Sequence, residues 1–180
     1  MNNTMKLLYD EHEITVNAID AAQQARSLIG KDDIQYEKTI RSLINFFRSY
    51  ADKFHHYKEE IILFPEMEKK NELLSSGVIK EMFENHENFR EMIKEIEKNL
   101  NEKKYPAAQK ELEQYAEALL DHIAVENDEV FQMAETLLSE TELQNMHFRF
   151  EDCDRELGIE MKKELAEMAA TLRKQLLLGE

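Results

Sequence analysis

The most chemically suggestive part of the sequence is residues 55–65, which read HHYKEEIILFP. Two adjacent histidines are each followed four residues later by a glutamate: His55 by Glu59, and His56 by Glu60. Side chains four residues apart lie on one face of an α-helix, so each imidazole would lie close to a carboxylate. A pair of this kind is either an ion pair or half of a metal site.

Three further histidines fall at comparable depths of other predicted helices. His122 precedes Glu126 by four residues, whereas His12 and His86 lie among apolar residues at helical spacing. Taken singly, such a pair is more often a solvated surface pair, and such a histidine is more often an ordinary core residue. The whole set is harder to explain in that way, because burying several carboxylates and imidazoles together is costly unless a cation balances them.

The types of donor narrow the choice of metal. Imidazole and carboxylate without thiolate suit iron, manganese or zinc, and disfavour calcium and magnesium. Six such side chains are too many for one tetrahedral zinc ion, but they suit two metals that each bind two histidines and share two carboxylates. The predicted metal ligands are His12, His55, Glu59, His86, His122 and Glu126.

The doubled histidines and glutamates leave a choice of helical register. At about 100° per residue, the apolar stripe that precedes the stretch is centred near Phe47. His55 and Glu59 then lie beside this stripe, whereas His56 and Glu60 fall on the opposite side of the helix. We therefore predict that His55 and Glu59 point inward. His56 and Glu60 are predicted to form a solvated pair or to contact the ligands from outside.

Composition indicates the elements that must position these residues. The chain has two prolines, four glycines and many strong helix formers, so we predict an all-α protein with long helices and few connections. Helices are predicted over about residues 4–29, from 33 to a kink or end at Pro65, 76–100 and 106–138. Short connections make neighbouring helices antiparallel, giving an up-down four-helix bundle over residues 1–138. A capping box at Ser139 and an interruption at Gly158 predict additional C-terminal helices over residues 139–180, packed on the same domain.

The charge of the chain limits its partners. There are 38 acidic and 23 basic side chains, giving a net charge of −15 that repels phosphate backbones and anionic lipid. We therefore expect neither a nucleic-acid nor a membrane partner. The first residues contain no apolar signal segment, no apolar run is long enough to span a bilayer, and the single Cys153 cannot form an intrachain disulfide. These features predict a cytoplasmic protein.

With these residues placed, the sequence resembles the hemerythrin-like domains of the HHE cation-binding family over nearly all of the four bundle helices. The resemblance is carried by four segments: DEHE at 10–13, the stretch 55–65, ENHE at 84–87 and DHIAVEN at 121–127. It implies a four-helix bundle around a non-haem di-iron centre, in which an oxo or hydroxo group bridges two iron ions. It also implies that His12 and His55 bind one iron, that His86 and His122 bind the other, and that Glu59 and Glu126 bridge them.

Two positions differ from the oxygen-carrying members of the family. Those members have a further histidine four residues after the third-helix ligand, where this chain has Arg90, and an aspartate five residues after the last histidine, where it has Asn127. The chain is thus similar to the four-histidine, two-glutamate subgroup, whose members are linked to nitric oxide, peroxide, oxygen or iron handling. Members that repair iron–sulfur clusters carry an extra N-terminal segment with a cysteine. This chain starts at the first predicted helix, so we do not expect that role.

The expected function follows from this resemblance. We expect a di-iron protein that binds and reduces a small ligand (oxygen, nitric oxide or peroxide), with an electron donor that the sequence does not identify. Enzymatic turnover stays open, because a non-catalytic sensor or iron-storage module is the alternative. A bundle with purely structural histidines is a third hypothesis. Tyr9 and Tyr115 are predicted either to contact a metal-bound ligand or to be ordinary core tyrosines. Arg90 is predicted either to lie beside the site and orient an anionic ligand or to be a surface side chain.

Overall fold

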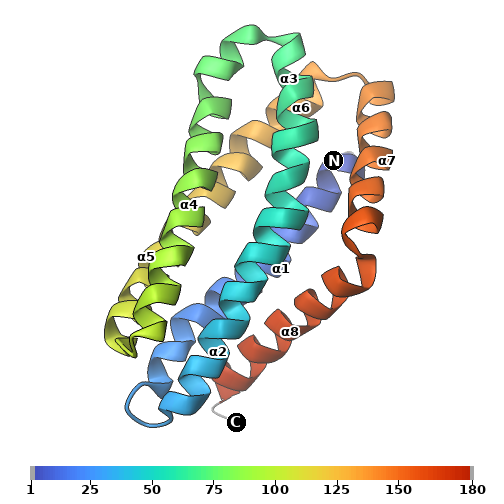
Figure 1. Cartoon of the computed structure of the whole chain (residues 1–180). Helices are drawn as coiled ribbons and strands as arrows, with labels where there is room; N and C mark the ends of the chain where they lie inside the picture. Colours follow the sequence, from blue (N-terminus) through green and yellow to red (C-terminus); the bar gives the residue numbers. More distant parts are fainter. Residues whose placement is uncertain (1–2, 179–180) are drawn as a thin grey trace.

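The computed structural model describes residues 3–178, and it is built from helices that run alternately up and down (Figure 1). The first rod is α1 (Asn3–Gln24) with the 3₁₀ turn η1 (Ala25–Leu28). The second rod comprises α2 (Asp33–Phe46), η2 (Phe47–His56), η3 (Glu59–Leu63) and α3 (Phe64–Lys70). After the turn η4 (Glu72–Ser76), the third rod is α4 (Val78–Asn101), and the fourth comprises α5 (Tyr105–Val125), η5 (Glu126–Val130) and α6 (Phe131–Leu137). The predicted all-α, up-down antiparallel four-helix bundle is confirmed.

The helix ends follow local side-chain chemistry. The Asp32 carboxylate accepts a hydrogen bond of 2.9 Å from the backbone N–H of Gln35, which caps α2. Pro106 lies in the first turn of α5, where its missing N–H would have no intrahelical partner in any case. These two signals explain why the predicted starts of the second and fourth rods are close to the observed ones.

The second and fourth rods contain π-helical turns. The segments η2, η3 and η5 form i→i+5 hydrogen bonds, so their turns are wider than those of an α-helix. The segments η3 and η5 begin at Glu59 and Glu126, the two predicted bridging carboxylates. After η3 ends at Leu63, Pro65 falls in the first turn of α3, so it lies where π winding changes to α winding while the rod continues to Lys70.

The interior of the bundle is divided into two apolar clusters with a polar layer between them. One cluster includes Ile19, Phe47 and Leu112. The other includes Leu8 and Phe64. Most of the fully buried histidines and glutamates lie between these clusters along the rods, so the predicted ligands are enclosed by apolar packing on both sides.

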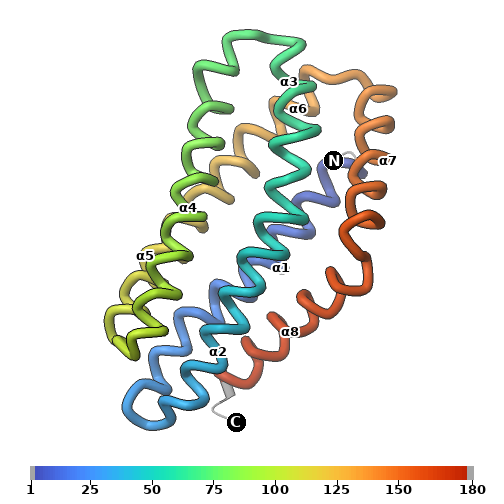
Figure 2. Tube along the Cα trace, viewed as in Figure 1, coloured from blue at the N-terminus to red at the C-terminus, as the bar shows by residue number. Residues whose placement is uncertain are grey.

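Two further helices, α7 (Glu140–Leu157) and α8 (Ile159–Leu178), return along the outside of the bundle (Figures 1 and 2). The predicted capping box at Ser139 is present, and Gly158 turns the chain between them at φ +108°. Leu165 and Ala169 of α8 are buried in the first apolar cluster, where α8 packs against α1. The division into parts 1–138 and 139–180 stays a prediction, and residues 1–2 and 179–180 lie outside the described part.

Among residues 3–178, no helix combines the length and the apolar character needed to cross a membrane.

Candidate metal centre

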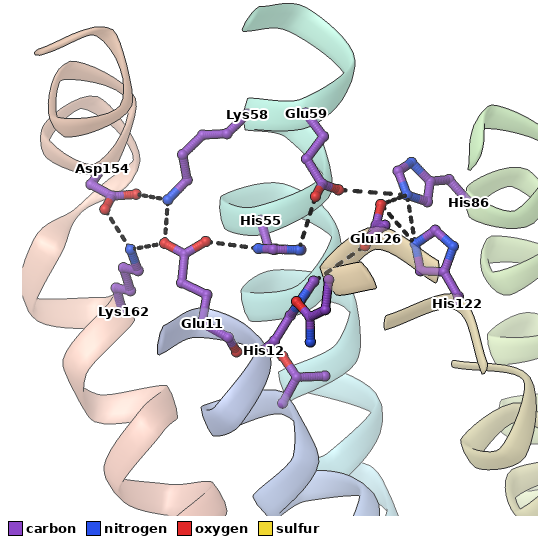
Figure 3. Close-up of polar contacts among 12 residues, drawn as sticks. Glu11, His12, His55, Lys58, Glu59, His86, His122, Glu126, Asp154 and Lys162 are labelled. Carbon is purple, nitrogen blue, oxygen red and sulfur yellow. Dashed lines mark hydrogen bonds and ion pairs between the residues drawn. The ribbon is translucent and has the colours of Figure 1, made fainter. Parts of the chain in front are cut away.

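Seven side chains with metal-ligating atoms converge in the polar layer of the bundle, within the part of the chain that the structure describes. All of them except His56 are labelled in Figure 3. They fall into two groups, and within each group the candidate donor atoms lie within 4.8 Å of one another. The first group contains His12, His55, Glu59 and Glu126, and the second contains His56, His86 and His122. All six predicted ligands are therefore brought together.

The first group pairs each histidine with a carboxylate. His12 Nε2 lies 3.2 Å from Glu126 Oε2, and His55 Nε2 lies 3.3 Å from Glu59 Oε1. These residues come from α1, η2, η3 and η5, so three of the four rods meet at this point.

The second group contains only imidazoles. His86 Nε2 and His122 Nε2 lie 3.1 Å apart. The ring of His56 stacks on that of His86, with centroids 3.8 Å apart and planes inclined by 12°. These rings come from η2, α4 and α5.

The two carboxylates lie between the groups. Glu59 directs Oε1 toward His55 and Oε2 toward His86, 3.6 Å from its Nε2. Glu126 directs Oε2 toward His12 and Oε1 toward His122, 3.2 Å from its Nε2. Each carboxylate thus presents one oxygen to each group, which is the orientation that a bridging carboxylate requires.

The facing atoms of the first group and of its two carboxylates lack hydrogen-bond partners. All seven side chains are buried, and Glu59, His86 and Glu126 are completely inaccessible to solvent. Nε2 of His12, Nε2 of His55 and both oxygens of Glu59 and Glu126 make no hydrogen bond. Buried polar atoms are normally paired, because each unpaired group costs about 1–3 kcal/mol. A divalent cation in each group would satisfy these atoms, so the donor set fits a pair of metals.

Residues around the cluster hold the imidazoles by their other nitrogen. His12 Nδ1 lies 2.8 Å from Asn127 Oδ1, and His55 Nδ1 lies 2.8 Å from Glu11 Oε2. His86 Nδ1 lies 2.8 Å from Glu60 Oε1. An imidazole that donates from Nδ1 keeps the Nε2 lone pair for a metal. Glu60 therefore contacts the site from outside, which was one of the two predicted alternatives. The contacts of Glu11 and Asn127 were not predicted, because the only sequence feature that pointed to these residues is that they adjoin His12 and Glu126.

The electrostatics show how the cluster is balanced without metal. Burial opposes protonation of His55, but Glu59 and Glu11 raise its pKa to about 10. Burial likewise opposes protonation of His86, but Glu126 and Glu60 raise its pKa to about 9. Protons on these rings therefore neutralise the buried carboxylates at neutral pH, and metal ions would have to displace them.

His56 is the residue that the sequence-based register misplaced. It was predicted to form a solvated pair or to contact the ligands from outside. Its burial excludes the solvated pair, and its ring belongs to the second group. The prediction assumed α-helical rotation, whereas η2 is wound as a π-helix and turns less per residue. Two consecutive side chains, His55 and His56, can therefore both face the interior. Burial and the neighbouring His86 lower the pKa of His56 well below its usual range, so this ring is neutral.

A cavity of about 230 Å³ lies beside His56. Its lining includes Phe47, Asp52, Arg90 and Tyr115. Arg90 donates from Nη2 to Glu60 Oε1 at 2.7 Å and from Nε to Asp52 Oδ1 at 2.9 Å. Arg90 is thus beside the site and not a free surface side chain.

The tyrosines near the predicted ligands differ in position. Tyr115 lines the cavity beside His56, whereas the Tyr9 hydroxyl donates to the backbone carbonyl of Asn127 at 2.8 Å. Tyr9 thus holds the segment that carries Asn127.

Comparison with known proteins agrees with this geometry. The family model described as the hemerythrin HHE cation binding domain matches residues 3–134, which is more than half of the chain. The chain belongs to the hemerythrin HHE cation-binding family, a family of helical bundles that bind metal. No curated protein and no solved structure matches the chain.

Proposed function

We propose that the polar layer holds two iron ions. His12 and His55 bind one ion, His86 and His122 bind the other together with His56, and Glu59 and Glu126 bridge the two. The single observation that carries this proposal is that each buried carboxylate presents one oxygen to each group of histidines. Imidazole and carboxylate donors suit iron better than calcium or magnesium, and the metal-binding family agrees with that choice.

The function that this centre supports best is binding and reduction of a small ligand, namely oxygen, nitric oxide or peroxide. A pair of ferrous ions supplies the electrons for such a reduction, and an external donor must restore them. The first group offers two imidazoles and the second three, so we assign the exogenous ligand to the side of His12 and His55. Arg90 no longer indicates a missing imidazole, because His56 supplies one from another helix.

The residues of the chain limit what can reach the centre. The seven donors are buried between two apolar clusters, so bulky or strongly hydrated molecules are excluded. The cavity beside His56 is large enough for small molecules, but it lies on the side of the second group, and neither His12 nor His55 lines it. Asn127, Glu11 and Glu60 keep the imidazoles oriented while a ligand binds.

The test begins with metal analysis of protein loaded anaerobically with ferrous iron. We expect two irons per chain, and we expect the double variant His55→Ala/His122→Ala to lose both. The matched control is His147→Ala, because His147 lies on α7 and belongs to neither group. A wild-type protein with fewer than about one metal per chain, unchanged in the double variant, would exclude the metal centre.

Stopped-flow spectroscopy of the reduced protein then tests the reaction. Mixing with oxygen, nitric oxide or peroxide in the presence of excess reductant should consume one of these ligands over many turnovers. A stable adduct without consumption would exclude the reductive function and favour a sensor.

Sensing is the second candidate, and one observation favours it. Glu11, which contacts His55, also forms an ion pair with Lys162 of α8. A change at the metal centre would therefore reach a helix on the outside of the bundle.

A further inference from the structure

Behind His55 lies a compact cluster of four buried or nearly buried charges (Figure 3). It consists of Glu11, Lys58, Asp154 and Lys162. Glu11 Oε2 lies 2.8 Å from His55 Nδ1, and Lys58 Nζ donates to Asp154 Oδ1 at 2.8 Å. Lys58 and Lys162 each form an additional ion pair with Glu11, and Lys162 also pairs with Asp154.

The charges in this cluster balance. Burial opposes ionisation of Glu11, but Lys58, His55 and Lys162 hold its pKa well below the usual range. Two carboxylates therefore face two ammonium groups, and the Lys58 side chain is completely inaccessible to solvent. A buried network of this kind is weak evidence for stability, because the cost of desolvating the ions is comparable with their attraction. Its contact with a candidate metal ligand suggests a different role.

Half of the cluster comes from outside the region that the family model matches. Asp154 belongs to α7 and Lys162 to α8, whereas the match ends at residue 134. Both residues are four positions from Gly158, whose N–H donates to the Asp154 carbonyl and whose carbonyl accepts from the Lys162 N–H. The bend between α7 and α8 thus brings one anion and one cation to the same point behind His55.

We propose that Asp154 and Lys162 are positioning residues that make the α7–α8 bend a functional part of the metal centre. They act through Glu11, by setting how strongly its carboxylate attracts the Nδ1 proton of His55. A stronger attraction makes the imidazole a more basic ligand, which stabilises the ferric ion over the ferrous ion. This inference depends on the proposed iron centre.

The proposal predicts opposite effects for the two residues. In Lys162→Met, Glu11 loses one of its cations and attracts the His55 proton more strongly, so the reduction potential of the iron falls. In Asp154→Asn, Lys58 and Lys162 lose one of the two anions that they pair with, so they interact more strongly with Glu11. Glu11 then attracts the His55 proton less, and the reduction potential of the iron rises. The direct electrostatic effects of removing a positive or a negative charge have the same signs. A merely structural role would instead move both variants in the same direction, toward loss of metal and of stability.

The experiment is a potentiometric titration of the full-length, iron-loaded protein, followed by its visible absorption. We expect each variant to change the ferric-to-ferrous ratio at a fixed potential by about tenfold, equivalent to 59 mV for a one-electron couple, with opposite signs. Lys162→Arg should restore the wild-type value. The matched control is Arg173→Met, which breaks the 2.7 Å ion pair between Arg173 of α8 and Asp20 of α1 without touching the cluster behind His55.

Three outcomes would overturn the proposal while leaving the iron centre intact: unchanged potentials in both variants, shifts of the same sign, or an equal shift in Arg173→Met. Iron content and the thermal midpoint of the metal-free protein are measured on each variant, so a variant that fails to fold is recognised and Lys162→Arg is compared with Lys162→Gln instead. A wild-type protein that binds no iron would refute the proposed function itself, which is a distinguishable result.

Discussion

His56 shows what a single residue contributes at the polar layer. Its Nδ1 is buried without a hydrogen bond, and Asp52 Oδ1 lies 3.5 Å away. Its ring stacks directly on His86, with no opposite charge between the rings. A buried imidazole arranged in this way destabilises the metal-free protein, because an unpaired polar atom has been removed from water. A cation bound to the ring at the proposed centre would make the arrangement favourable.

Replacing His56 therefore separates stability from metal binding. We expect His56→Leu to lower the iron content from two per chain toward one, while the thermal midpoint of the metal-free protein stays the same or rises by a few degrees. The rise is expected because an apolar side chain has no buried nitrogen to satisfy. Metal analysis and circular-dichroism melting of the apoprotein measure the two effects.

The control for this variant is His147→Leu, which removes the histidine that lies outside both groups. It should leave the iron content at two. Full iron content in His56→Leu would mean that only His86 and His122 bind the second ion.

At the scale of the elements, local chemistry could be predicted, but the winding of the helices could not. The cap at Asp32 and the capping box at Ser139 are short sequence patterns, and both are present. The inward positions of His12, His86 and His122 follow from apolar spacing on helices that are α-helical at those points. The predicted orientation of His56 was wrong because a π-helical segment changes the rotation per residue, and no pattern that we used in the sequence signals that change.

The cluster behind His55 could not be predicted for a different reason. Lys58 and Glu11 appear in the sequence as ordinary charged residues of acidic helices. Their burial depends on where α7 and α8 return along the bundle, since Asp154 and Lys162 supply the opposite charges. Pairings between residues about 100 or more positions apart leave no local pattern.

The α7–α8 bend provides a prediction at this scale. Gly158 has φ +108°, a backbone conformation that side-chain-bearing residues rarely adopt. Gly158→Ala should therefore lower the free energy of unfolding by about 1 kcal/mol or more, and it should loosen the approach of Asp154 and Lys162. Urea denaturation measures the first effect, and the iron reduction potential measures the second.

Glu164→Ala is the matched control for the bend, because Glu164 is exposed on α8. It should change the free energy of unfolding by less than about 0.5 kcal/mol. An equally stable Gly158→Ala protein would show that the backbone relaxes at the bend and that the glycine is not required there.

For the whole molecule, the polar layer is a cost that the two apolar clusters must offset. The layer places two carboxylates and five imidazoles in the interior, where charged groups are stable only when balanced. Without metal, the balance comes from protons on His55 and His86. A metal ion bound at the proposed centre would compete with protons for the same nitrogens, so folding, metal binding and pH would be linked.

This linkage predicts how the stability of the metal-free protein depends on pH. Histidine in the unfolded chain has a pKa of about 6.5, whereas the folded protein raises it to about 10 at His55 and about 9 at His86. A raised folded-state pKa contributes stability that is fully present below pH 6.5 and is lost as the pH rises through 9 to 10. A pKa difference of one corresponds to about 1.4 kcal/mol, so the loss should amount to several kcal/mol.

In the iron-loaded protein, metal replaces the protons on these rings, so this loss should be absent. Urea denaturation between pH 6 and pH 10 measures the stability of the metal-free and iron-loaded forms. The difference between the two curves reports on the polar layer alone, because both forms share all other titrating groups. Parallel stability curves for the two forms would contradict the exchange of protons for metal at His55 and His86.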